Sequence, residues 1–141
     1  MTVLPQILSL ASRRDELRRL SFFVDQFCAL ARVPDEDRRS FKVALEEVAM
    51  NIIEHGYKCA EAGLFTVSME VKEDRLTAVI TDRAPAYDPL ARADVNLDLP
   101  FDQRPIGGLG IHLVKKLMDA RYERRDDCNI LTLSRKLSAY P

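Results

Sequence analysis

One predicted helix carries a line of polar side chains that could do chemistry. Over residues 41–57, apolar residues recur at the spacing of a helix packed on a core. Glu47, Asn51 and Glu54 fall on nearly the opposite side, at i, i+4 and i+7, so their side chains meet along one line. Such a line is often only a solvated face. However, an amide and a carboxylate one turn apart can also hold a hard cation and place a general base.

Asp82 is a second candidate because it ends an apolar stretch that predicts a strand. A carboxylate at that place can accept a hydrogen bond from the amine on the edge of adenine, whereas guanine presents a carbonyl there. One buried aspartate can therefore choose adenine. On its own the signal is weak, because an aspartate before a proline-containing turn is usually a turn former.

Three glycines precede a third predicted helix, in the run Gly107-Gly108-Leu109-Gly110. Glycines let backbone amides approach a ligand closely. The helix expected over residues 111–119 adds free N–H groups and a positive dipole end, which suit a phosphate. The run lacks the Gly-Lys-Ser/Thr ending of a Walker motif. Taken alone, it is equally compatible with a flexible loop.

Hydrophobic periodicity predicts the elements that position these stretches. We expect strands over 2–10, 64–72, 76–81, 121–125 and 129–137, and helices from Ser12 to about Arg32, from Asp35 to Gly56 and over 111–119. Ser12 and Asp35 are the predicted N-caps of the first two helices. Residues 90–106 have no clear period and predict a long loop of the functional kind. Consecutive hairpins favour an α+β two-layer sandwich, a mostly antiparallel sheet with helices on one face.

Composition narrows the classes of function. The 141 residues predict a single domain, 1–141, and the formal net charge of −1 gives no bulk field for nucleic acid or an anionic membrane. The sequence has no apolar run long enough for a membrane span. Its three cysteines are scattered, which indicates reduced thiols in a cytoplasmic protein rather than a disulfide framework.

Taken together and in this order, residues 46–57, 82–89 and 107–111 resemble the N, G1 and G2 boxes of the GHKL ATPase superfamily. Within it, the chain is most similar to the RsbW-like anti-sigma factor serine/threonine kinases. The resemblance covers about residues 7 to 137. It implies a Bergerat-type fold that holds ATP and Mg²⁺ between the helices and the sheet.

The resemblance also implies roles for individual residues. Asn51 would bind Mg²⁺ and Glu47 would be the general base for the phosphoacceptor hydroxyl. The other expected ATP-binding residues are Asp82 for adenine, Ala84 in the same loop, Gly107, Gly108 and Gly110 at the phosphates, and Arg104 as the nearby cation. Residues 90–106 would form the lid. Ala84 departs from the family pattern, which has glycine at this third position of the G1 box.

The leading functional hypothesis is a kinase that phosphorylates a STAS-type anti-sigma antagonist and regulates a sigma factor. The alternative is a non-catalytic ATP-binding module whose nucleotide shapes a partner-binding surface, and a detached histidine-kinase catalytic domain is a weaker third. The family also suggests a homodimer. An apolar segment from Val3 to Leu10 is compatible with one, because an edge strand can pair across subunits.

Overall fold

The computed structural model describes residues 2–58, 63–91, 98–100, 102 and 109–138. Five strands are present among these residues: β1 (Val3–Ala11), β2 (Leu64–Lys72), β3 (Arg75–Asp82), β4 (Asp119–Arg125) and β5 (Cys128–Lys136). Three α-helices accompany them: α1 (Leu17–Leu30), α2 (Asp35–Asn51) and α3 (Leu109–Leu117). Short 3-10 turns lie at Arg14–Glu16 and Pro89–Ala91, and a π-helical turn spans Ile52–Gly56.

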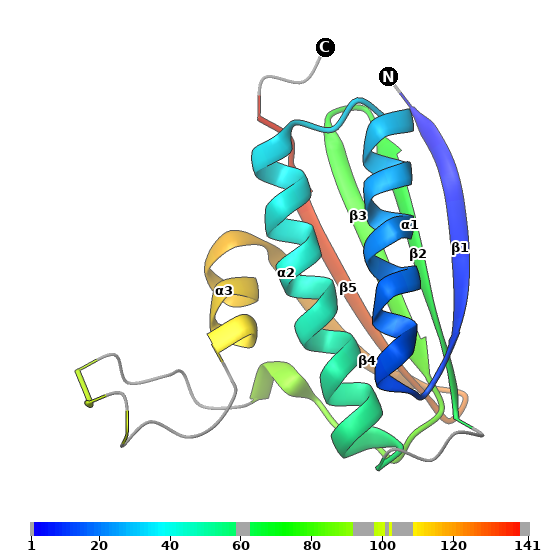
Figure 1. The fold of residues 1–141 in the computed structure, drawn as a ribbon, viewed down its shortest axis with the longest axis vertical. Coiled ribbons are helices and arrows are strands. Elements are labelled where there is room, and N and C mark those ends of the chain that lie inside the picture. The colour runs from blue at the N-terminus through cyan, green and yellow to red at the C-terminus, as the bar shows by residue number, and fades with distance from the viewer. Residues whose placement is uncertain (1, 59–62, 92–97, 101, 103–108, 139–141) are drawn as a thin grey trace.

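The strands form one antiparallel sheet in the order β1-β2-β3-β5-β4. The last strand of the chain is therefore inserted between β3 and β4. All three helices lie on the same face of this sheet (Figure 1). The predicted fold class, an α+β two-layer sandwich with an antiparallel sheet and helices on one face, is confirmed.

The hydrophobic core lies between the helices and the inner face of the sheet. Strand residues alternate between buried and partly exposed positions, so that Phe65, Val67, Met69 and Val71 of β2 point into the core. The predicted apolar stripe of α2 is buried at every position: Phe41, Ala44, Leu45, Val48, Ala49 and Ile52. The period-2 and helical patterns of the sequence therefore identified the buried faces correctly.

The two predicted helix caps are wrong. Arg13 and Pro34 occupy the N-cap positions before the 3-10 turn and α2, and neither forms a side-chain cap. Ser12 Oγ is buried and has no hydrogen-bond partner among the described residues. Glu16 instead reaches back from the 3-10 turn to β1, where its Oε1 accepts the Ala11 N–H at 3.0 Å. This backbone hydrogen bond lowers the pKa of Glu16 more than its partial burial raises it.

The end of α2 fixes the approach to the site. The helix continues to Gly56, as predicted, but its last turn is π-helical, a form that is rare and concentrated at functional sites. Tyr57 follows, and its hydroxyl donates to the Leu64 carbonyl at 2.7 Å and accepts the Arg83 N–H at 2.8 Å. One side chain thereby joins the end of this helix to the start of β2 and the end of β3.

A buried ion pair joins the other end of α2 to β5. Asp37 is fully buried, and its Oδ1 lies 3.1 Å from Nε of Arg135. Its Oδ2 accepts the backbone N–H of Ser138 at 3.1 Å. Because unpairing a buried charge is strongly destabilising, this pair fixes the helix against the sheet far from the cavity described below.

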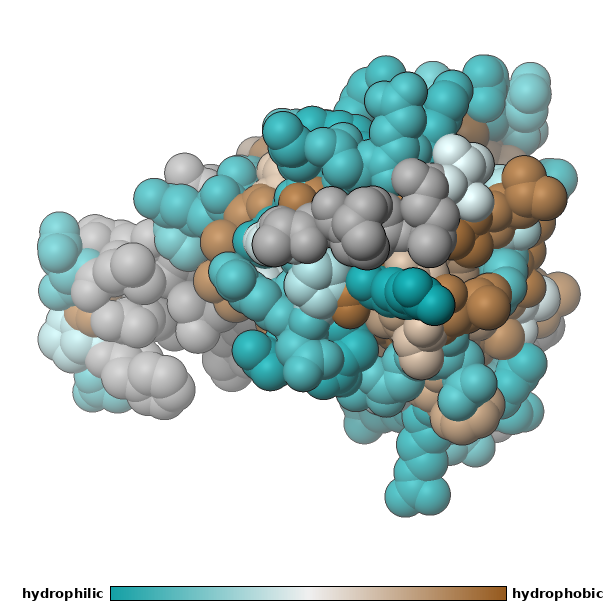
Figure 2. Space-filling model, turned by 90° about the horizontal axis from the view of Figure 1, so that it is seen from above, coloured by the Kyte–Doolittle hydropathy of each residue, from teal (hydrophilic) through white to brown (hydrophobic). Residues whose placement is uncertain are grey.

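Exposed apolar side chains gather on the β1 side of the molecule, at the right of Figure 2. Leu4 and Ile7 of β1 are 76% and 70% exposed, and Phe22 of α1 is also exposed. The opposite edge strand, β4, carries charge at five of its seven residues. No helix among the described residues has the length and apolar character needed to cross a membrane.

Candidate functional site

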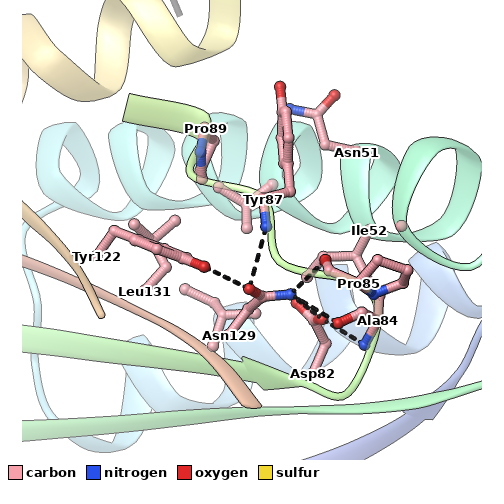
Figure 3. A pocket seen from close by; sticks show the side chains of 13 residues that line it. Asn51, Ile52, Asp82, Ala84, Pro85, Tyr87, Pro89, Tyr122, Asn129 and Leu131 are labelled. Atoms are coloured by element: carbon pink, nitrogen blue, oxygen red, sulfur yellow. Dashed lines mark hydrogen bonds between the residues drawn. The ribbon is translucent and has the colours of Figure 1, made fainter. Parts of the chain in front are cut away.

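A small cavity lies where α2, β3, β5 and the loop after β3 meet (Figure 3). Its lining is mostly apolar, with a few convergent polar groups, as in small-molecule sites. The lining residues are Val48, Asn51, Ile52, Gly56, Ile80, Asp82, Ala84, Pro85, Tyr87, Pro89, Tyr122, Asn129 and Leu131. Three of the predicted ATP-binding residues, Asn51, Asp82 and Ala84, are thus brought to one cavity.

Asp82 ends β3 and is only 7% exposed. Its Oδ1 accepts two hydrogen bonds, from the Ala84 N–H at 2.9 Å and from Nδ2 of Asn129 at 2.8 Å. Burial raises the pKa of this carboxyl above its ordinary value, and the two hydrogen bonds oppose that rise. Among the described residues no hydrogen bond reaches Oδ2. The cavity therefore contains a buried carboxyl group with one oxygen left to accept a ligand donor.

Ala84, the departure from the family pattern, fits because of the residue opposite it. Ala84 is buried, and a Cβ built on Gly56 would lie 3.1 Å from the Ala84 Cβ. The extra methyl group at position 84 is therefore accommodated where the π-helical turn ends in a glycine. We infer that the methyl narrows the cavity beside Asp82 without blocking it.

The amide of Asn51 is the second unsatisfied group in the cavity. Its Nδ2 is buried and has no hydrogen-bond partner among the described residues. An unpaired buried amide is costly unless a ligand or water satisfies it. This N–H donor, together with the free oxygen of Asp82 and the apolar walls, fits a nucleotide that offers an acceptor oxygen. The amide oxygen of Asn51 is the atom that could bind a cation. The described residues contain no cluster of three or more His, Cys, Asp or Glu side chains arranged for a metal.

Glu47 lies one turn before Asn51 on α2 but does not line the cavity. Its side chain packs under the first turn of α3, where a Cβ built on Gly110 would lie 2.3 Å from Glu47 Cγ. Glycine at position 110 is what permits this approach. The start of α3 thus lies directly on the predicted base. Gly107, Gly108, Arg104 and most of the predicted lid lie outside the described residues.

Sequence reasoning missed Asn129, which lies at the centre of the cavity wall (Figure 3). It is the second residue of β5 and pairs in register with Asp82 of β3. A signal was present: Asn129 shares the inward phase of the strand with Leu131 and Leu133, so a polar residue occupies an apolar position. The partner of that inward amide could not be identified without knowing that β5 lies beside β3.

The comparison with known protein families agrees with this geometry. Residues 10–135 match the family described as the histidine kinase-like ATPase domain. The chain belongs to this family. Membership of the histidine kinase-like ATPase family implies that the chain binds ATP. The predicted resemblance to the GHKL superfamily is confirmed.

Curated relatives of this histidine kinase-like ATPase domain carry the name serine-protein kinase RsbW. The protein from Halalkalibacterium halodurans is 28% identical over 100 residues, which cover 68% of this chain and 60% of the relative. Those from Bacillus licheniformis and Bacillus cereus are 31% and 32% identical over 88 residues, 60% of this chain and 55% and 54% of theirs. The chain therefore spans a little over half the length of these kinases.

A solved structure shows the same fold. The RsbU and RsbW domains of Rv1364c from Mycobacterium tuberculosis superpose with a TM-score of 0.63. The match covers 95% of this chain and 32% of that one, at 16% sequence identity. At this identity, the similarity supports the arrangement of helices and strands rather than a shared substrate.

Proposed function

We propose that this histidine kinase-like ATPase domain is an ATP-dependent serine/threonine kinase that phosphorylates a STAS-type anti-sigma antagonist and thereby regulates a sigma factor. One observation carries the proposal. Glu47 and Asn51 lie one turn apart on α2, and Asn51 lines the cavity that contains Asp82 and has an unpaired Nδ2. Binding ATP alone does not require a carboxylate at position 47. The names of the curated relatives support the same activity.

Each residue has a distinct task in this proposal. Asp82 accepts a hydrogen bond from the adenine amine, and the amide oxygen of Asn51 would hold Mg²⁺. Bound there, Mg²⁺ would neutralise phosphate charge, and one protein ligand beside the phosphates is enough to hold it. Glu47 accepts the proton of the serine or threonine hydroxyl as that oxygen bonds to the γ-phosphorus and ADP departs. Gly110 keeps the start of α3 close to Glu47.

Replacement of the carboxylate tests the assignment of the base. Glu47→Ala should abolish transfer of labelled phosphate from ATP to the antagonist while leaving ATP affinity within about threefold, because no part of Glu47 lines the cavity. The loss of transfer expected for a general base is about 10²- to 10⁴-fold. The matched control is Glu46→Ala, which removes the neighbouring carboxylate on the same helix and should transfer normally. Normal phosphate transfer by Glu47→Ala would show that Glu47 is not the general base.

The alternative, a nucleotide-loaded binding module without transfer, has one observation in its favour. Glu47 lies under α3 instead of lining the cavity, so a phosphoacceptor reaches it only past the first turn of that helix. In this case the parent protein binds ATP and its partner but transfers no phosphate to any antagonist. The transfer assay with the parent protein separates the two functions directly.

A further inference from the structure

Asn129 makes an unusually complete set of hydrogen bonds for one side chain. Its Nδ2 donates to Asp82 Oδ1 at 2.8 Å, to the Pro85 carbonyl at 3.1 Å and to the Ala84 carbonyl at 3.2 Å. Its Oδ1 accepts from the Tyr122 hydroxyl at 2.5 Å and from the Tyr87 N–H at 3.3 Å. The side chain is only 6% exposed, so these protein groups replace water around it.

This surrounding fixes which way the amide points. The Tyr87 N–H is a backbone donor, and the two backbone carbonyls can only accept. Turning the Asn129 amide by half a rotation would therefore set donor against donor and acceptor against acceptor. Its N–H groups consequently face the Asp82 carboxyl group and the loop after β3, as Figure 3 shows.

The fixed amide in turn holds the carboxyl group of Asp82. Asn129 and the Ala84 N–H both bond to Oδ1, and no described residue bonds to Oδ2. Both donors lie on one side of the carboxyl group, which fixes its rotation about χ2. The oxygen left over is the one that can meet a ligand in the cavity.

We propose that Asn129 is a positioning residue that sets the purine preference of the site. It holds the Asp82 carboxyl group so that the remaining oxygen accepts the exocyclic amine of adenine and repels the carbonyl of guanine. Without Asn129 the carboxyl group can rotate or protonate, and both purines meet a less defined partner. This inference rests on the proposed nucleotide-binding function of the same cavity.

The protonation state of Asp82 provides an independent readout. The Asn129 hydrogen bond lowers the pKa of Asp82 against the rise caused by burial. Removing that bond therefore raises the pKa, and the acid form persists to higher pH. The ionised form is the better acceptor for the adenine amine. As the pH is lowered, ATP affinity should therefore begin to fall at a higher pH in the variant than in the parent.

Nucleotide titrations test the proposal. ATP and GTP binding to the full chain would be measured by calorimetry from about pH 5 to about pH 8, a range that brackets a carboxyl group with a raised pKa. In Asn129→Ala, ATP affinity should fall about tenfold near pH 7, about the effect of one hydrogen bond to a charged group. GTP affinity should fall less, so the ATP-to-GTP ratio drops, and the pH at which ATP binding is half lost should rise.

Two further variants serve as a second test of the Asn129 side chain and as a control on the same strand. Asn129→Asp keeps the shape and the acceptor for Tyr122, but places a second carboxyl group beside Asp82, so it should lower the ratio at least as much. Thr132→Ala, on the other face of the same strand, should leave both affinities unchanged. The loop keeps a second tie in these variants, because Nη1 of Arg124 donates to the Ala84 carbonyl at 2.8 Å.

Equal losses of ATP and GTP affinity, with no shift in pH dependence, would make Asn129 a structural residue only and overturn the inference. In that result the parent still prefers ATP, so the proposed function stands. A parent that binds neither purine nucleotide would overturn the proposed function and this inference together.

Discussion

At the scale of single residues, we propose that the purine preference depends mainly on Asp82. We expect Asp82→Asn to lower ATP affinity at least about tenfold, because the change replaces an acceptor that faces the adenine amine by a donor. The parent should bind GTP poorly, since a guanine carbonyl would face the carboxylate. Calorimetry with ATP, ADP and GTP on both proteins measures these differences. An unchanged ATP affinity in Asp82→Asn would show that Asp82 does not bind the adenine amine.

The same substitution should leave the fold intact. Burial raises the pKa of Asp82, so the folded protein binds this proton more tightly than the unfolded chain does. The free energy of unfolding therefore decreases as pH rises from the unfolded pKa through the raised folded pKa. At neutral pH the ionised group is a cost to folding, partly offset by its two hydrogen bonds. A neutral amide of the same size avoids that cost, so the Asp82→Asn variant should remain folded. Thermal denaturation followed by circular dichroism tests this.

At the scale of elements, the contact between α2 and α3 depends on Gly110. In Gly110→Ala the new Cβ would lie 2.4 Å from the Cβ of Glu47 as well as 2.3 Å from its Cγ. Rotation of the Glu47 side chain cannot relieve the first of these contacts, so the two helices must separate. We expect the free energy of unfolding to fall by about 1–3 kcal/mol, the usual cost of overpacking. Urea denaturation measures this change.

A double-mutant cycle tests whether the loss of unfolding free energy comes from the contact between positions 110 and 47. In a Glu47→Gly background both clashing atoms are absent, so Gly110→Ala should cost far less than it does in the parent. The same cost in both backgrounds would show that Gly110 is needed for another reason, such as the backbone conformation at the start of α3.

Elements were predictable where a local pattern carried the information. Alternation identified the buried face of β2, and helical spacing identified the buried stripe of α2. The start of α1 was not predictable, because Glu16 reaches the Ala11 N–H only once the strand and the 3-10 turn are placed. The π-helical turn before Tyr57 has no hydrophobic period of its own to reveal it.

The site was predictable to the extent that its residues lie in contiguous motifs. Asn51, Asp82 and Ala84 each belong to such a motif, and the structure brings them to one cavity. Asn129 belongs to none, because its position depends on long-range pairing between β3 and β5. That pairing is a property of topology, which a local reading of the sequence does not contain.

At the scale of the whole molecule, the two edges of the sheet differ in character. The β4 edge is charged, which protects it from further pairing, whereas β1 exposes Leu4 and Ile7. We propose that two copies pair through β1 and that the parent is a dimer in solution. Light scattering after size exclusion should give twice the chain mass, and Ile7→Lys should give a monomer. A monomeric parent at micromolar concentration contradicts this pairing.

The insertion of β5 between β3 and β4 also orders events in time as the chain is synthesised. While the ribosome is still making residues 128–136, β4 has no neighbour in the sheet, and the cavity lacks the wall that carries Asn129 and Leu131. Chains grow at about 5–20 residues per second, N-terminus first. A nascent chain therefore cannot draw on ATP to stabilise a partly made domain. We therefore expect nucleotide binding to begin only when β5 has left the exit tunnel and entered the sheet.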